Sequence, residues 1–183
     1  MKMHAFSYIF QNRKEGFSSL TTQEKIYIFL LNENPIVKII TTTNLNKDKP
    51  EYHNVGYTDN KSAYGYIYDG ERWIKKEIQP IMNDLLDSKE QDLAKIHDQI
   101  RGYLSEDLNN SIKNKLNEIQ CTIQPKLESH VKSKKDLVRN IKTKFYNDRS
   151  LVLESMKRSE QKINNAKKED NVDDLLMKGL KEV

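Results

Sequence analysis

The sequence predicts an α+β protein that is mostly α-helical, with a small three-stranded β-meander and N-terminal helices followed by a long antiparallel helical hairpin. Apolar side chains alternate with a period of two between residues 53 and 74, which is typical of strands. They recur every three or four residues over 78–104 and 108–145, which is typical of helices. Charged residues make up 32% of the chain, and this composition favours long solvated helices over a thick core.

Two short helices are expected before the strands. Thr21 and Glu24 are spaced as a capping box ahead of an apolar run, so a first helix begins there. Pro35 suits the first position of a second helix. Its residues 36–43 are rich in Ile, Val and Thr and are also compatible with a strand, but we favour the helix. Residues 44–50 form a polar loop.

The strand region contains a hairpin signal. Asp69-Gly70 separates the runs 66–68 and 72–74, and an Asp-Gly pair in this position predicts a type I′ turn, in which both central residues have positive φ. A preceding strand at 53–58 completes the meander. Helices must pack against so small a sheet, because an isolated ribbon is only marginally stable.

Two long helices follow. The first has an apolar stripe at Ile78, Ile81, Leu85, Leu93, Ile96, Ile100 and Leu104. Ser105 caps the second, and acidic residues lie in its first turn, where the helix dipole favours them. The second stripe contains Leu108, Ile112, Leu116, Ile119, Ile123, Leu127 and Val131, and is rejoined by Val138, Ile141 and Phe145.

Pro125 interrupts this second stripe. An unbroken helix over 106–145 would be about 60 Å long, which is too long for a compact domain. Proline lacks a backbone donor, so it kinks or breaks the helix at a cost of about 3 kcal/mol or more, and we favour the bend. The helices before and after Ser105 fold back as an antiparallel pair.

Three parts of the chain result from these assignments. Residues 1–75 form a small α+β head, residues 76–147 form a long helical hairpin arm, and residues 148–183 form a basic-to-acidic C-terminal tail that is partly helical or disordered.

The composition excludes several classes of protein. Cys121 is the only cysteine, so no intramolecular disulfide can form and we expect an intracellular, reducing environment. No apolar stretch approaches the roughly 20 residues that span a bilayer, and Met1 does not begin a secretory signal pattern, so no membrane association is expected.

No catalytic or metal site is predicted. The histidines, His4, His53, His97 and His130, occur singly, and one cysteine cannot complete a tetrahedral zinc site. Cys121 lies between Ile119 and Ile123 and is expected to be a buried structural thiol. The carboxylates are spread along a helix and the glycines form no phosphate-binding loop. We therefore expect neither an enzyme nor a cofactor.

Residues 126–168 carry 13 bases and 5 acids, a formal charge of +8. The densest basic residues are Lys132, Lys134, Lys135, Arg139, Lys142 and Lys144. Lys135, Arg139 and Lys142 fall along one side of a helix and could contact successive phosphates. Lysine predominates, so base-specific recognition is not indicated. A solvated helix face explains the same charge, and that alternative stays open.

The meander is rich in aromatic residues, namely Tyr57, Tyr64, Tyr66, Tyr68 and Trp73. Exposed aromatic side chains on a sheet can stack on unpaired bases. Packing against the helices is the commoner use, and it is the interpretation that we favour here.

The segments KPEYHNV at residues 49–55 and YGYIYDG at 64–70, with Trp73, resemble the region downstream of the zinc finger in a family of giant-virus (mimivirus-type) proteins. The similarity covers roughly residues 35–150 and includes the motif YNDR at 146–149. Its motif residues are His53, Asn54, Tyr66, Tyr68, Asp69, Gly70 and Trp73, to which it assigns a structural or binding role. The zinc finger is absent, so zinc binding and finger-based DNA recognition are not implied.

The resemblance implies a viral accessory protein. Our leading hypothesis is a non-enzymatic protein that uses the helical arm for self-association, as in a coiled coil, or for binding a protein partner. Its expected location is the cytoplasm or viral factory of the infected cell, or the virion. The alternative is a sequence-nonspecific nucleic-acid-binding protein that acts through the basic segment 126–168.

Overall fold

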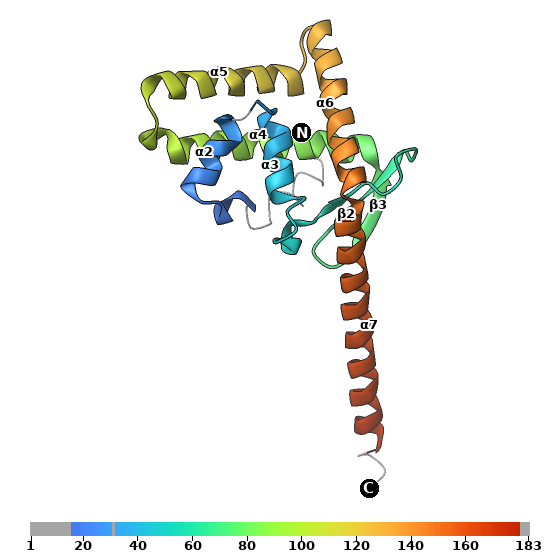
Figure 1. Ribbon diagram of the computed structural model, residues 1–183. Coiled ribbons are helices and arrows are strands. Elements are labelled where there is room, and N and C mark those ends of the chain that lie inside the picture. Colours follow the sequence, from blue (N-terminus) through green and yellow to red (C-terminus); the bar gives the residue numbers. More distant parts are fainter. Residues whose placement is uncertain (1–15, 31, 180–183) are drawn as a thin grey trace, which may run out of the picture.

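The computed structural model describes residues 16–30 and 32–179, with side chains described up to residue 166. The fold is α+β and mostly α-helical, as predicted (Figure 1). In chain order its main elements are α2 (Thr22–Leu30), α3 (Pro35–Thr43), β1 (Val55–Gly56), β2 (Tyr64–Tyr68), β3 (Trp73–Glu77), α4 (Ile78–Ile100), α5 (Glu106–Ile123), α6 (Glu128–Asn147) and α7 (Arg149–Gly179). Short 3₁₀ turns lie at Gly16–Ser19, Pro50–Tyr52 and Arg101–Tyr103.

The two N-terminal helices begin at the predicted signals. The Thr21 amide donates to Glu24 Oε2 at 2.7 Å and the Glu24 amide donates to Thr21 Oγ1 at 3.2 Å, which is a reciprocal capping box. Pro35 is the first residue of α3, and the Asn34 side chain accepts a hydrogen bond from the Ile36 amide. The segment 36–43 is therefore a helix, which confirms the alternative that we favoured.

The strands form an antiparallel sheet in the order β1-β2-β3. Val55 pairs with Ile67, and Tyr68 pairs with Trp73. The first strand is shorter than predicted, Val55–Gly56 instead of 53–58, although the Asn54 carbonyl still accepts a hydrogen bond from the Tyr68 amide. No loop separates β3 from α4, so the sheet fixes the start of that helix.

The β2–β3 hairpin is present, but the predicted type I′ turn is wrong. Of the two predicted turn residues, Gly70 has a positive φ, +113°, and Asp69 does not, whereas a type I′ turn needs a positive φ at both. The loop has four residues, and the Asp69 carboxylate stabilises it by accepting hydrogen bonds from the Glu71 and Arg72 amides at 2.8 and 2.9 Å. These two bonds, chiefly that from Arg72, lower the pKa of the Asp69 carboxyl.

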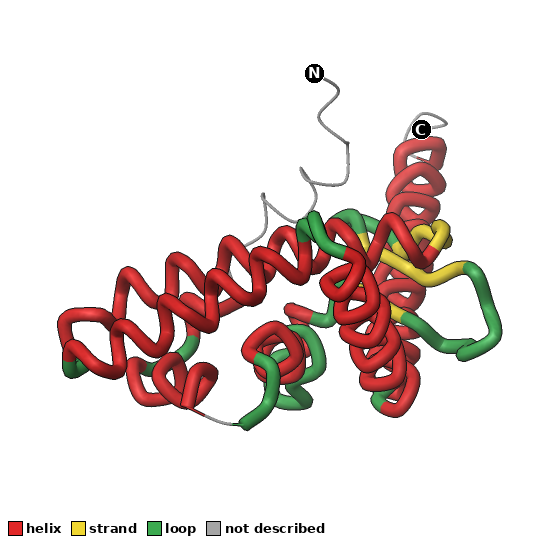
Figure 2. The backbone as a smooth tube through the Cα atoms, turned by 90° about the horizontal axis from the view of Figure 1, so that it is seen from above, coloured by secondary structure: helices red, strands yellow, loops and turns green. Residues whose placement is uncertain are grey.

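Helices α4 and α5 form the predicted antiparallel hairpin (Figure 2). The Ser105 side chain caps α5 by accepting from the Leu108 amide at 3.3 Å. On its other side, α4 packs against α2, α3 and the sheet, so its apolar stripe is covered within the chain. One core extends from Phe17 to Phe145, and the boundary predicted at residue 75 falls inside β3.

Pro125 ends a helix rather than bending one, so the favoured bend is wrong. Helix α5 stops at Ile123, a loop covers residues 124–127, and α6 leaves in a new direction (Figure 1). The residue before a proline is disfavoured in helical geometry, and Gln124 has φ −111° and ψ 70°. The apolar stripe breaks at the same point, because Leu127 is 60% exposed.

Helices α6 and α7 follow one another end to end as a long rod, with Asp148 between them (Figure 1). The first turns of α7 pack on β1, where Val152 is fully buried. Gly56 permits this contact, because a Cβ there would lie 2.6 Å from Val152 Cγ1. Further along, α7 projects away from the body. The predicted tail beyond residue 148 is helical through residue 179.

Candidate nucleic-acid interface

Three cations of α6 line one groove, which we call the α6 groove. They are Lys135, Arg139 and Lys142, the three residues that the helical spacing places on one side. The opposite wall comes from the chain after β1, and the remaining lining residues are Tyr57, Asn60, Val138, Thr143, Tyr146 and Asn147. Positive charge and two aromatic rings therefore meet in one concavity.

Tyr57 fixes the position of the groove wall. Its ring is 2% exposed, and its hydroxyl lies 3.0 Å from the Asn60 carbonyl oxygen. The Lys142 ammonium lies 4.8 Å from the centre of the Tyr57 ring, a cation–π contact that joins α6 to the chain after β1. Arg139 reaches Asp136 at 3.3 Å, but both side chains are largely exposed, so this ion pair is weak.

The other three predicted basic residues lie outside this groove. Lys134 donates to the Ile123 carbonyl at 2.8 Å, where it caps the end of α5. Lys144 pairs with Glu33 at 3.4 Å and so joins α6 to the loop before α3. Lys132 is exposed and does not line the groove. The structure thus brings three of the six basic residues together.

The YNDR motif lies at the junction of α6 and α7. The Arg149 guanidinium lies 4.3 Å from the centre of the Tyr146 ring and donates to the Tyr146 carbonyl at 2.8 Å. Asp148 is the C-cap of α6, and its amide bonds to the Lys144 carbonyl. These contacts set how α7 continues from α6, and they hold the Tyr146 ring at one end of the α6 groove.

His53 and Asn54 tie three segments of the chain together. The buried His53 ring places Nε2 2.7 Å from the Asn46 carbonyl oxygen and Nδ1 3.2 Å from Ser155 Oγ on α7. Asn54 Oδ1 accepts a hydrogen bond from the Asn44 side chain at 2.8 Å. Both residues therefore position the start of β1 and the helix beside it.

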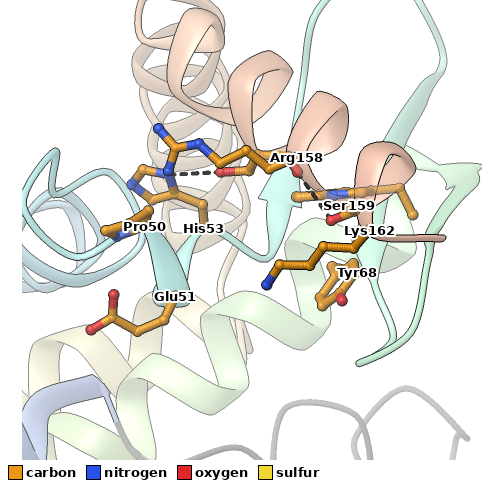
Figure 3. Close-up of a pocket in the computed structure, with 9 residues that line it drawn as sticks. Pro50, Glu51, His53, Tyr68, Arg158, Ser159 and Lys162 are labelled. Carbon is orange, nitrogen blue, oxygen red and sulfur yellow. Dashed lines mark hydrogen bonds between the residues drawn. The ribbon is translucent and has the colours of Figure 1, made fainter. Parts of the chain in front are cut away.

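A second groove lies between the hairpin end and α7, and we call it the α7 groove (Figure 3). Its lining residues are Pro50, Glu51, His53, Tyr68, Trp73, Ser155, Arg158, Ser159 and Lys162. The rings of Tyr68 and Trp73 have centroids 5.5 Å apart and are tilted by 45°. The predicted motif residues His53, Tyr68 and Trp73 thus meet here.

Sequence reasoning did not single out Arg158 and Lys162. Both belong to the +8 segment, and residues 155, 158, 159 and 162 share one helix face because they are three or four positions apart. That spacing was a usable signal. What it could not reveal is that the sheet aromatics lie opposite this face.

The meander aromatics have different environments. Tyr57 is buried, Tyr66, Tyr68 and Trp73 are half-buried, and Tyr64 is 46% exposed with the Lys75 ammonium 5.2 Å from its ring centre. Gly70 and Asp69 shape the loop that ends the hairpin. The group is therefore neither wholly core nor an open stacking surface.

Cys121 is exposed, so the predicted buried thiol is wrong. Ile119 and Ile123 are buried and lie four residues apart on one face of α5. Cys121 lies two residues from each, which places it about 200° around the helix from both. Nearness in sequence to Ile119 and Ile123 therefore does not place Cys121 on their buried face of α5.

Two carboxyl groups on α4 have raised pKa values. Burial is the main cause for Glu90, and the neighbouring Asp87 carboxylate adds to it. Loss of hydration raises the pKa of Asp87, and the Lys134 charge partly opposes this shift. Neither residue lines the α6 or the α7 groove, so these shifts belong to the packing of α4.

Within residues 16–30 and 32–179, no group of three or more potential ligand residues could hold a metal ion. In the same part of the chain, no helix is both long and apolar enough to cross a membrane. No protein-family model, curated protein or solved structure matches this chain. The resemblance to giant-virus proteins stays a prediction.

Proposed function

We propose that the protein binds nucleic acid without sequence specificity, through the α6 groove. The observation that carries the proposal is the gathering of Lys135, Arg139 and Lys142 on one concave surface. Three cations in a row along a helix suit a row of phosphates, whose neutralisation releases counterions. Two of the three cations are lysines, and the arginine side chain is exposed and held only weakly, by its ion pair with Asp136. This set favours contact with the nucleic-acid backbone over recognition of base edges.

The test removes the three charges without removing the side-chain length. The triple variant Lys135→Gln, Arg139→Gln, Lys142→Gln keeps helix-compatible residues, so α6 should stay folded. Its affinity for nucleic acid should fall for all sequences alike, and the slope of log affinity against log salt should shrink by about 3. Both quantities come from titrations by fluorescence anisotropy at several salt concentrations.

The control removes the same charge from the same basic segment outside either groove. Lys126→Gln, Lys132→Gln, Lys157→Gln changes three exposed lysines that line neither groove. This variant should lose much less affinity than the groove variant. Equal losses of affinity in the two variants would mean that binding depends on net charge and not on the α6 groove. A parent protein that binds no nucleic acid would overturn the proposal.

A second candidate function is self-association through α7. Its projection from the body and the exposure of Leu153 and Ile163, at 41% and 38%, favour it. The apolar stripe of α4, which suggested a self-associating arm, is covered within the chain. We therefore assign self-association to α7 instead. Sedimentation of the full chain and of a chain ending at residue 160 tests this: a concentration-dependent dimer that the truncation abolishes is expected.

We also propose, on the resemblance of segments 49–55 and 64–70, a non-enzymatic accessory protein of giant-virus origin that acts inside the infected cell. Its single cysteine agrees with a reducing environment. Immunodetection in the cytoplasm, viral factories and purified particles of infected cells would place it, and its exclusive presence outside cells would contradict the proposal.

A further inference from the structure

We infer that the α7 groove binds an unpaired nucleotide of a single strand, with its base against Tyr68 and Trp73 and its phosphate on Arg158 and Lys162. The inference rests on the proposed function and deepens it, because it names single-stranded nucleic acid as the ligand. It is carried by residues of the groove that packing does not explain.

The cations of the α7 groove are available to a ligand. In Figure 3 the Lys162 side chain lies near Tyr68, and the Arg158 side chain extends from α7 toward His53. Arg158 pairs with Glu154 at 3.6 Å, but the two side chains are 58% and 62% exposed, so exchanging this partner for a phosphate has little cost. Arginine also matches the geometry of phosphate oxygens.

The opposite side of the groove contains two half-buried aromatic rings. Tyr68 and Trp73 are paired across β2 and β3, and their rings contact one another. The Trp73 indole Nε1 is buried and has no hydrogen-bond partner among the described residues. Aromatic faces beside cations are the combination that binds unpaired bases.

Glu51 determines the orientation of the ligand. Its carboxylate lines the groove and lies away from α7 (Figure 3). A phosphate near Glu51 would be repelled, so the phosphate belongs on the α7 side and the base on the sheet side. Paired bases in a duplex are already stacked and cannot enter such a groove.

Trp73 supplies a direct test because it is the only tryptophan in the chain. A single-stranded oligonucleotide should quench its fluorescence. A duplex of the same length and an oligonucleotide of abasic sites with the same charge should bind through phosphates with little quenching. If all three quench equally, or if none does, the proposed contact with the base is overturned.

Substitutions test the two halves of the groove separately. Tyr68→Leu should weaken single-strand binding about 5- to 100-fold and leave duplex binding unchanged, since stacking on one base is lost. Tyr103→Leu removes an aromatic ring that is 74% exposed in the turn between α4 and α5, and it should change neither single-strand nor duplex binding. A Tyr68→Leu protein that binds single strands like the parent would overturn the inference.

The charged residues should act in opposite directions. The pair Arg158→Gln, Lys162→Gln should reduce the single-strand salt slope by about 1 to 2, more than the control pair Lys132→Gln, Lys157→Gln. Glu51→Gln should strengthen binding about two- to fivefold by removing repulsion. Weaker binding of the Glu51→Gln protein would overturn this orientation of the ligand.

The outcomes distinguish this inference from the proposed function. If the parent binds no nucleic acid, the proposed function fails. If the α6 triple variant weakens binding while Tyr68→Leu and Trp73 fluorescence are silent, the proposed function stands and the α7 groove assignment fails. If a free nucleoside monophosphate quenches Trp73 with the affinity of the oligonucleotide, the single strand is the wrong ligand.

Discussion

Helices α4 and α7 are both long, but they are held in different ways. Helix α4 has buried side chains in almost every turn, namely Ile78, Ile81, Met82, Leu85, Leu86, Lys89, Leu93, Ile96, His97 and Ile100. Helix α7, as far as its side chains are described, buries only Val152 and leaves Leu153 and Ile163 exposed. The difference shows that similar helical content can depend on tertiary packing in one segment and on local interactions in another.

Helix α7 has only weak local support within its own length. Its Arg158–Glu154 pair is spaced four residues apart at 3.6 Å, and such a pair adds a few tenths of a kcal/mol. Isolated helices in water are marginal without an apolar face to bury. Equivalent substitutions in the two helices should therefore have very different effects on stability.

Ala94→Pro should have the largest effect. Ala94 is exposed inside α4, so the variant removes a backbone hydrogen bond and strains the preceding turn without losing side-chain packing. We expect a loss of about 3 kcal/mol or more in the free energy of unfolding by urea. Ala94→Ser keeps the backbone donor and should cost less than about 1 kcal/mol; similar losses for both would mean that α4 tolerates interruption.

Gly56→Ala tests the anchor of α7. The new Cβ would lie 2.6 Å from Val152 Cγ1, so helix or strand must shift, at a cost of about 1–3 kcal/mol. Val152→Ala makes room, and the double variant should be more stable than the sum of the two single effects predicts. Additive effects in this double-mutant cycle would mean that Gly56 does not affect stability through its contact with Val152 on α7.

Gly70→Val measures backbone strain alone. Gly70 has φ +113° and nothing lies within 4 Å of a Cβ built there, so contacts cannot contribute. We expect a loss of about 1–2 kcal/mol, because a β-branched residue is poorly tolerated at positive φ. Gly102→Val is the matched control, with equally open space and no positive φ; its thermal stability should change less.

Ala166→Pro should have the smallest effect on global stability. Ala166 is exposed in the projecting part of α7, so circular dichroism should lose helical signal while the unfolding transition of the body changes by less than about 0.5 kcal/mol. A loss as large as that of Ala94→Pro would mean that this part of α7 is packed, and a second copy of the chain would become the expected partner.

Local signals in the sequence predicted most of the elements. The capping box at Thr21 and Glu24, the proline that opens α3 and the Ser105 cap each act within one helical turn, so neighbouring residues suffice to recognise them. The hairpin was also found, but its turn type was not, because the hydrogen bonds of the Asp69 carboxylate make a four-residue loop stable without positive φ at Asp69.

The grooves depended on contacts that local patterns do not encode. Helical spacing placed Lys135, Arg139 and Lys142 together. It could not predict that Tyr57, 85 positions before Lys142, forms the opposite wall of the groove. The stripes of α4 and α5 predicted that these two helices pack against each other, but they did not reveal that α2, α3 and the sheet also cover α4. Periodicity identifies a buried face but not its partner.

The hydrogen bond between His53 and Ser155 joins positions 102 residues apart. Closing so long a loop has an entropic cost that shorter contacts avoid, so it is expected late in folding. During synthesis the residues up to α5 emerge first and can assemble around α4. The contacts of β1 and the His53 ring with α7 can form only after α7 has left the ribosome. The α7 groove is therefore completed only after residues 155–162 have been synthesised, and a ribosome stalled before residue 155 would display a chain without it.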